Sequence, residues 1–271
     1  MASDFTKADP AIAVAIPPRV CDKVRIRFQK GGDLRLVSHR DLMKCFERIL
    51  RRAALPVHVS QGFHPMPRMV FGMPLALGIV GLAEVLELEL DQVIEPDEVQ
   101  RRLAEQMPQG LEILSAKRIA PKAAVQVRRA GYRVAVSAER RADLPERIAA
   151  LVAAKECWIE RTRPSPRRID LRPYLSELRL TDQTLEMLLW VTPTGAARPD
   201  EVLALLGLGD LTGAGAPLER HVLELHDENS TQRPTPEAPP PIVCPADPTV
   251  GRPPNKNQPT ALVAGPMSFD S

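Results

Sequence analysis

The stretch K-V-R-I-R-F-Q-K-G-G-D-L-R-L-V-S-H-R-D-L-M-K-C-F-E-R-I-L-R-R, residues 23–52, contains two hydrophobic periods in succession. In residues 24–29 every second side chain is apolar, which is the period of a strand with one buried face. Beyond the double-glycine break, apolar side chains recur at helical spacing over residues 42–53. Ser38 and Asp41 have the spacing of a capping box, which marks the start of that helix. We therefore expect a strand followed by a helix.

The rest of the chain repeats these patterns in an order that indicates two similar halves. In the first half we expect a helix at 96–106 and strands at 68–73, 84–90 and 111–119. In the second half we expect helices at 144–155 and 199–206, an extra arm at 168–180, and strands at 132–137, 157–162, 185–192 and 220–226. Both halves follow the order β-α-β-β-α-β, in which a four-stranded antiparallel sheet is backed by two helices. The predicted fold class is therefore α+β, with two tandem ferredoxin-like units at residues 21–122 and 130–228.

Composition indicates which parts fold and in which compartment. With 44% hydrophobic residues, the 271-residue chain can bury a core. Residues 1–20 lack a sustained period and residues 229–271 are rich in proline, so both segments are expected to be disordered. No run of eighteen apolar residues and no signal-peptide pattern occurs, so we expect no membrane span. The four cysteines are scattered without a C-x-x-C pair, which argues against a disulfide framework or a metal site and favours the cytoplasm.

Positive charge is concentrated near the start of the chain. Residues 23–72 carry eleven Lys and Arg against three Asp and Glu, although the whole chain has a net charge of only +2. Such asymmetry favours a polyanionic partner, most often nucleic acid. The expected RNA contacts are the basic residues of the first helix: Lys44, Arg48, Arg51 and Arg52. Aromatic residues make up 4% of the chain, so contact with the RNA backbone is expected rather than reading of bases. The alternative is a solvated basic face without a partner.

The segment S-Q-G-F-H-P-M-P-R, residues 60–68, is the sharpest candidate for a binding loop. Its two prolines restrict the backbone to extended conformations, and Gly62 permits a turn or the close approach of a ligand. A rigid loop of this kind can present fixed polar groups to a partner. The alternative is a stiff connector in which Phe63 and Met66 fill the core.

Two further features are candidates for the same site. In the first turn of the helix, His39 is expected to be neutral because the positive end of the helix dipole disfavours its protonation; the alternative is a structural hydrogen bond. In D-L-R-P-Y, residues 170–174, alternate side chains share one face if the segment is extended, and they either reach a cleft or form a structural ion pair. The candidate functional cleft comprises Ser38, His39, Asp41, Ser60, Gln61, Gly62, Phe63, His64, Pro65, Pro67, Arg68, Asp170, Arg172 and Tyr174. No catalytic residue is assigned, because no P-loop, glycine-rich nucleotide motif or triad signature occurs.

Three segments of the chain resemble one bacterial family. V-R-I-R-F-Q-K-G-G-D-L-R-L-V-S-H-R-D-L, S-Q-G-F-H-P-M-P-R and I-D-L-R-P-Y-L are similar to the radical-SAM-associated proteins of unknown function, which are encoded beside, or fused behind, cobalamin-type radical SAM proteins. The resemblance covers residues 23–228. It implies a role in RNA modification or ribosome biogenesis. Because this chain lacks a C-x-x-x-C-x-x-C motif, it would be the accessory partner of a radical SAM enzyme.

Three functions follow from these observations. The leading hypothesis is an RNA-binding accessory protein, without a cofactor of its own, that presents tRNA or rRNA to a separate radical SAM enzyme. The second is an RNA-modifying or RNA-processing enzyme of pseudouridine-synthase-like architecture, which requires His39, Asp41, His64, Asp170 and Tyr174 to lie close in space. The third is a protein-only adaptor whose basic helix docks on an acidic partner.

Overall fold

The residues that open the sequence form the strand and the helix that their periods predict. In this computed structural model, strand β1 (Asp22–Lys30) buries its apolar side chains on one face, and helix α1 (His39–Arg52) follows. The Oγ atom of Ser38 accepts a hydrogen bond from the backbone N–H of Asp41 at 3.2 Å. The Ser38 hydroxyl in turn donates to the Asp41 carboxylate at 2.7 Å. Ser38 is therefore the N-cap of α1, as predicted.

The structure describes residues 22–162, 165–211, 213 and 215–228. All of them belong to one compact unit, residues 1–239. The segments expected to be disordered, residues 1–20 and 229–271, lie outside the described residues. Among the described helices, none has the length and apolar character needed to cross a membrane.

The described elements confirm the α+β class. After β1 and before α1 comes a short 3₁₀ helix, η1 (Gly32–Leu36). After α1 the order is β2 (Met69–Phe71), β3 (Val80–Leu90), α2 (Pro96–Ala104), β4 (Leu111–Arg118), β5 (Val127–Ala135), α3 (Ala138–Arg141), α4 (Leu144–Ala153), β6 (Trp158–Arg161), β7 (Arg167–Asp170), η2 (Arg172–Tyr174), β8 (Leu175–Thr181), β9 (Thr184–Thr192), β10 (Gly195–Ala196), α5 (Pro199–Leu205) and β11 (Glu219–Leu225).

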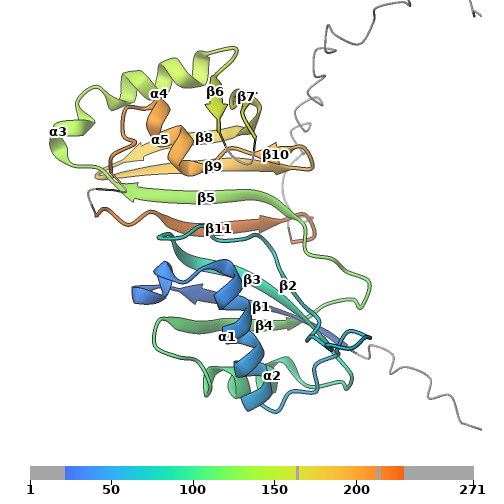
Figure 1. The fold of residues 1–271 in the computed structure, drawn as a ribbon. Coiled ribbons are helices and arrows are strands. Elements are labelled where there is room, and N and C mark those ends of the chain that lie inside the picture. Colours follow the sequence, from blue (N-terminus) through green and yellow to red (C-terminus); the bar gives the residue numbers. More distant parts are fainter. Residues whose placement is uncertain (1–21, 163–164, 212, 214, 229–271) are drawn as a thin grey trace, which may run out of the picture. The chain divides into compact units, whose positions relative to one another are not determined.

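Nine strands of the described residues form one mixed sheet (Figure 1). Its order is β10-β9-β5-β11-β3-β1-β4, with β2 also paired to β3 and β8 also paired to β9. Neighbouring strands are antiparallel, except that β11 and β3 run parallel where residues 219–220 lie opposite residues 80–81. This parallel pair joins the strands of the first half of the chain to those of the second half.

Each half of the sheet has its own hydrophobic core. In the first half, Phe28 of β1 meets Phe46 of α1 edge to face, with ring centroids 5.0 Å apart. In the second half, Leu144 of α4, Leu203 of α5 and Leu189 of β9 belong to one buried cluster. Burying side chains of this size contributes about 1.5–3 kcal/mol each, so the two cores are what hold the helices on the sheet.

The second half departs from the expected order at one strand. Residues 157–162 were expected in the main sheet, but β6 pairs with β7 in a separate two-stranded sheet. Conversely β8, expected as part of an interrupting arm, pairs with β9 over most of its length. The connection is the turn Asp182-Gln183, in which Asp182 has a φ of 48°. A turn of two residues brings the strands on either side of it together, so β8 and not β6 lies beside β9.

Candidate nucleic-acid interface

Helix α1 presents a basic face to the solvent. Its opposite face carries Leu42, Phe46 and Ile49, which are buried against the sheet. The four expected RNA contacts are all exposed: Lys44, Arg48, Arg51 and Arg52. Lys44 lies 3.7 Å from Asp41, but both side chains are more than half exposed, so this ion pair adds little stability. The three arginines form no ion pair with a carboxylate of the described residues, so their charge is available to a partner.

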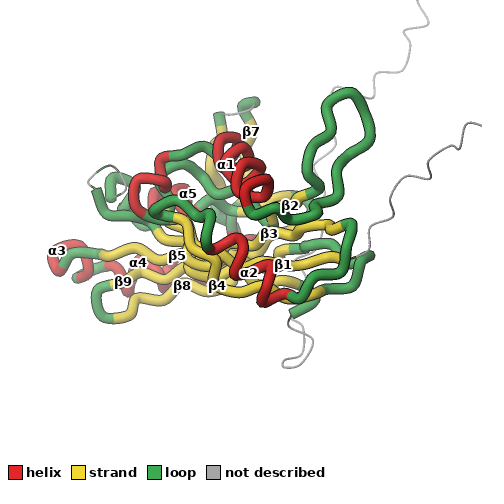
Figure 2. Tube along the Cα trace, turned by 90° about the horizontal axis from the view of Figure 1, so that it is seen from below, coloured by secondary structure: helices red, strands yellow, loops and turns green. Residues whose placement is uncertain are grey.

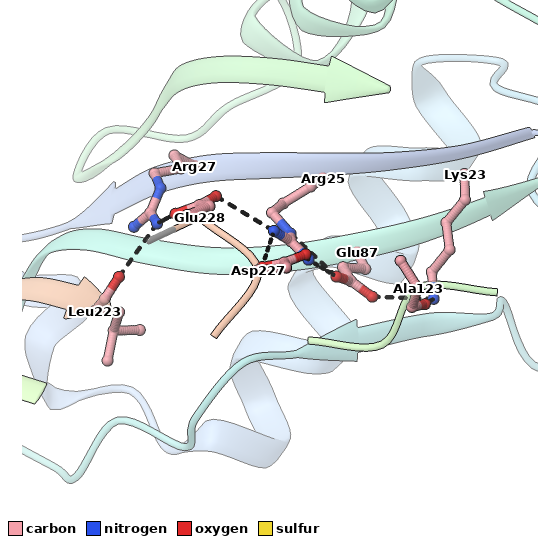
Figure 3. Close-up of polar contacts among 8 residues, drawn as sticks. All are labelled: Lys23, Arg25, Arg27, Glu87, Ala123, Leu223, Asp227 and Glu228. Atoms are coloured by element: carbon pink, nitrogen blue, oxygen red, sulfur yellow. Dashed lines mark hydrogen bonds and ion pairs between the residues drawn. The ribbon is translucent and has the colours of Figure 1, made fainter. Parts of the chain in front are cut away.

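The cations of β1 are not available in the same way (Figure 3). Arg25 is buried, and its guanidinium lies 2.7 Å from the Glu87 carboxylate and 2.7 Å from the Asp227 carboxylate. Lys23 also reaches Glu87, with 3.0 Å between Lys23 Nζ and Glu87 Oε2. These lysine and arginine side chains are therefore neutralised within the protein.

The segment that follows β11 completes this network of ion pairs. Asp227 and Glu228 lie beside β1, where Glu228 pairs with Arg27 (Figure 3). A hydrogen bond from Arg25, together with its charge, lowers the pKa of Asp227. Because these pairs neutralise the basic residues of β1, the surface charge of residues 23–72 is smaller than the sequence count indicates.

Lys30, Glu84 and Arg220 form a second set of buried charges, here called the buried ionic cluster. Glu84 is buried and pairs with Arg220, whose Nε lies 2.8 Å from Glu84 Oε1. Lys30 is 0% exposed and donates a hydrogen bond to the backbone oxygen of Val37 at 2.7 Å. Burial lowers the pKa of Lys30, and the nearby charge of Arg220 adds to this effect while that of Glu84 opposes it. Two cations and one carboxylate leave this buried region with a net positive charge.

The positions of Lys30 and Glu84 in the sequence indicate this cluster. Lys30 continues the inward-facing series of Val24, Ile26 and Phe28 in β1. Glu84 likewise shares the inward parity of Leu86 in β3. A charged residue at an inward position of a strand predicts a buried ion, and a buried ion needs a partner.

His39 lies at the edge of the buried ionic cluster, in the first turn of α1. Its ring meets Phe71 edge to face, with centroids 5.1 Å apart. Burial lowers the pKa of His39 below its ordinary value of 6.5, and the charges of Lys30 and Arg220 lower it further. The imidazole is therefore neutral at neutral pH, and burial is the largest cause.

The loop between α1 and β2 is a narrow hairpin. The Ser60 N–H donates to the Met66 backbone oxygen at 2.9 Å, and the Met66 N–H donates to Ser60 Oγ at 3.0 Å. The Arg68 N–H donates to the backbone oxygen of His58 at 2.7 Å. Gly62 has a φ of 134°, which favours glycine. Figure 2 shows a loop standing clear of the sheet beside β2. These bonds hold the expected binding loop in a defined shape.

The side chains of this hairpin face the solvent. Phe63 is 102% exposed and Met66 is exposed as well, so the alternative that they fill the core is wrong. Gln61, His64 and Arg68 are also exposed, and their side chains bond to none of the described residues. The other predicted residues of the loop lie in the same hairpin: Ser60, Gly62, Pro65 and Pro67. An exposed aromatic ring on a hydrogen-bonded loop is a platform on which an RNA base can stack.

Asp170, Arg172 and Tyr174 stabilise the second half of the protein. The Asp170 carboxylate accepts hydrogen bonds from the backbone N–H groups of Cys157 at 2.6 Å and Arg172 at 3.0 Å. The Arg172 guanidinium donates to the backbone oxygen of Ala154 at 3.1 Å. Tyr174 is buried in the second core. The Asp170 carboxylate and the Arg172 guanidinium, which were expected to face a cleft, therefore bond to the backbone of the second half.

The structure thus divides the predicted cleft into two groups. Ser38, His39, Asp41 and the hairpin belong to the first half, and residues 170–174 belong to the second half. Strands β11 and β5 lie between β3 and β9 in the sheet, so three strand spacings, about 14 Å, separate β3 from β9. The first group is the candidate interface.

Comparisons with known proteins place the chain in a family. A family model described as an uncharacterized protein conserved in bacteria (DUF2344) matches residues 23–199. The chain belongs to this family. The part matched by DUF2344 includes α1, the hairpin and residues 170–174, and it ends before β11, which supplies Arg220.

Other comparisons add little to the DUF2344 assignment. The search of curated proteins finds no match. Among solved structures, the chain is similar to the crystal structure of an unknown protein from Galdieria sulphuraria, with 15% identity, 75% of this chain and 98% of that chain covered, and a TM-score of 0.23. A likeness of this size carries no argument about fold or function.

Proposed function

We propose that this protein binds RNA through the basic face of α1 and the hairpin that follows it. The observation that carries the proposal is that Arg48, Arg51 and Arg52 are exposed on one helix without an ion pair to any described carboxylate. Phosphate groups are the anions that such a row of guanidinium groups binds best, because each can accept two parallel hydrogen bonds. The β1 cations are paired internally and have no part in this proposal.

Phe63 adds a second kind of contact to the proposed interface. Base stacking on an aromatic side chain is independent of sequence, and it requires an unpaired base. The combination of a basic helix with the exposed ring of Phe63 therefore favours single-stranded or looped RNA over a regular duplex. Loops of tRNA or rRNA have this character.

We further propose that the protein is an accessory to a separately encoded radical SAM enzyme in the cytoplasm. The resemblance of its three motifs to radical-SAM-associated proteins supports the partner. The free thiols of Cys45 and Cys157 accord with a reducing compartment. The alternative of an enzyme in its own right loses its support, because it requires Asp170 and Tyr174 to lie beside His39 and His64.

The finer description of the fold is also a proposal, namely that each half is a ferredoxin-like unit. The strand orders β4-β1-β3-β2 and β11-β5-β9-β8 support it, since each places the last and first strands of its half side by side. Two such units joined through β3 and β11 would offer RNA an extended surface.

The proposal is tested by reversing three charges on α1. We expect the triple variant Arg48→Glu, Arg51→Glu, Arg52→Glu to bind bulk tRNA far more weakly than the wild type. The slope of log K against log salt should also fall in magnitude by about 2, since three phosphate contacts are lost at about 0.7 each. The measurement is a filter-binding or anisotropy titration at several salt concentrations.

A matched control separates a local effect from one of net charge. Lys117, Lys122 and Lys155 are exposed and have no ion pair with a described residue, so reversing all three changes the net charge equally. The control variant should keep most of its RNA affinity. Equal loss in both variants would mean that binding follows overall charge. Unchanged binding in the α1 variant would remove the proposal and favour the adaptor, in which the same helix docks on an acidic protein.

A further inference from the structure

A pocket of about 670 Å³ lies where the two halves of the described chain meet. Four segments distant in sequence line it: the end of η1, the loop before β3, the start of α5, and the residues before β11. The Val80 N–H donates to the backbone oxygen of Leu218 at 3.0 Å, which fixes the loop before β3 against the segment before β11. The volume lies in the range of small-molecule sites, which occur preferentially where two substructures meet.

Much of the lining of this pocket is apolar, and part of that apolar surface is exposed to water. Leu36 and Leu77 line it and are 58% and 64% exposed. Monomeric proteins rarely leave clustered apolar side chains exposed to water. Ile79 and Leu218 line it and are buried. A ligand with an apolar body would cover the two exposed leucines.

Two arginines give the pocket a positive charge. Arg35 lines it and has no ion pair with a described carboxylate. Arg198 also lines it, and its nearest carboxylate, Glu201, is 3.9 Å away and already holds Arg161 through contacts of 2.6 and 2.7 Å. Asp200 contributes one opposing charge. The lining therefore keeps a net positive charge after its own carboxylate is counted.

The buried ionic cluster adds to this positive potential. Lys30 donates to the backbone oxygen of Val37, next to the pocket residue Leu36. Arg220 donates to the backbone oxygens of Met73 at 2.9 Å and Pro74 at 3.1 Å, in the same loop that lines the pocket. The cluster is therefore bonded to two of the segments that line the pocket, and its cations add to the positive charge on that side of the pocket.

We propose that this pocket binds a small organic anion, with its apolar body against Leu36 and Leu77 and its acidic group on Arg35 and Arg198. Guanidinium groups bind carboxylates and phosphates through charge-assisted hydrogen bonds, which are stronger than those to a neutral acceptor. The pocket shares no residue with the RNA interface proposed on α1. It gives the protein a second ligand, which differs from RNA in joining one acidic group to an apolar body.

The test compares an acid with its neutral isostere. The full-length protein, labelled at leucine methyl groups, is titrated with 4-phenylbutyrate and with 4-phenylbutanamide, and methyl shifts are followed by NMR. We expect saturable shifts at Leu36, Leu77 and Leu218 with the acid, and binding of the amide that is weaker by about 10-fold. Arg198→Gln should remove most of that difference. The matched control Arg179→Gln, an exposed arginine outside the pocket, should keep it.

Several outcomes would overturn the proposal. No saturable shift at these methyl groups with the acid would exclude a small-anion site. Equal affinity for acid and amide would exclude the acidic class of ligand. Shifts at these methyl groups with tRNA, but with neither small molecule, would assign the surface to RNA. None of these results bears on the α1 charge-reversal test, so the two proposals fail separately.

Discussion

Glu84→Gln tests whether the buried ionic cluster is held together by its single carboxylate. Glu84 accepts hydrogen bonds from Arg220, including one of 2.8 Å from Nε, and its charge acts on Lys30. Glutamine has nearly the same shape and keeps one acceptor oxygen. The substitution therefore removes a charge with little change in packing, and it leaves two buried cations without a counter-ion.

The expected cost follows from the burial of these groups. Removing one partner of a buried ion pair costs about 3–5 kcal/mol, and the remaining amide oxygen places this case near the lower limit. With an m-value of about 2 kcal/mol per molar urea, a loss of about 3 kcal/mol lowers the urea midpoint by about 1.5 M. Adding Lys30→Met to the variant removes one of the two unpaired cations and should restore part of the loss.

The assay is equilibrium unfolding in urea at 25 °C, followed by circular dichroism. Glu177→Gln is the matched control, because Glu177 pairs with Arg179 at 2.5 Å while both side chains are about half exposed or more. That exposed pair should be worth less than about 1 kcal/mol. If Glu84→Gln costs no more than Glu177→Gln, the cluster does not depend on its carboxylate and the reasoning is refuted.

Two further substitutions test the remaining parts of the site. Burial lowers the pKa of His39 in the folded state, so protons favour the unfolded chain and stability is lost as the pH falls below 6.5. His39→Gln removes this titrating group. Between pH 7.5 and 5.5 the unfolding free energy of the variant, measured by urea titration, should therefore fall less than that of the wild type. Equal losses in the two proteins would contradict the lowered pKa of His39. Phe63→Ala should weaken binding of single-stranded RNA by about 1–3 kcal/mol without changing the salt slope or the unfolding midpoint. If binding is unchanged while the α1 variant loses it, the hairpin has no role in RNA binding.

The elements that sequence reasoning predicted correctly depend on local patterns. The period of α1 and its Ser38 cap follow from residues within a few positions of one another. The loop after α1 was expected to be rigid, but its hairpin bonds were found only in the structure. The basic face of α1 is exposed for the same reason, since its hydrophobic residues determine which side turns to the sheet. The position of Arg48, Arg51 and Arg52 on the face opposite the core could be predicted in this way, whereas their lack of ion pairs with described carboxylates is known only from the structure.

The charge count failed because it ignored partners that are distant in the sequence. Glu87 is 62 positions from Arg25, and Asp227 is 202 positions from it. A window of fifty residues cannot contain either carboxylate. The count therefore treated buried and exposed cations as equal, and it overstated the positive surface that RNA would meet.

The placement of β8 and of Asp170 illustrates a second limit of prediction from sequence. Residues 157–162 and 175–181 both have short apolar patterns suited to a strand, and their periods do not say which one lies beside β9. The two-residue turn at Asp182 decides it. Asp170 was then free to bind the backbone N–H of Cys157, just before β6, and that of Arg172 instead of facing a cleft.

The sequence by itself determined the α+β class, the strand and helix that open the fold, and the exposed row of arginines, because each depends on contacts between near neighbours along the chain. Only the tertiary structure decided which charges are neutralised, that β3 and β11 join the halves into one sheet, and that Arg35 and Arg198 line one pocket. These outcomes depend on pairs of residues brought together from far apart, and their energies are gained only after the chain has closed large loops. No local pattern encodes such pairs, so they are read from the folded molecule.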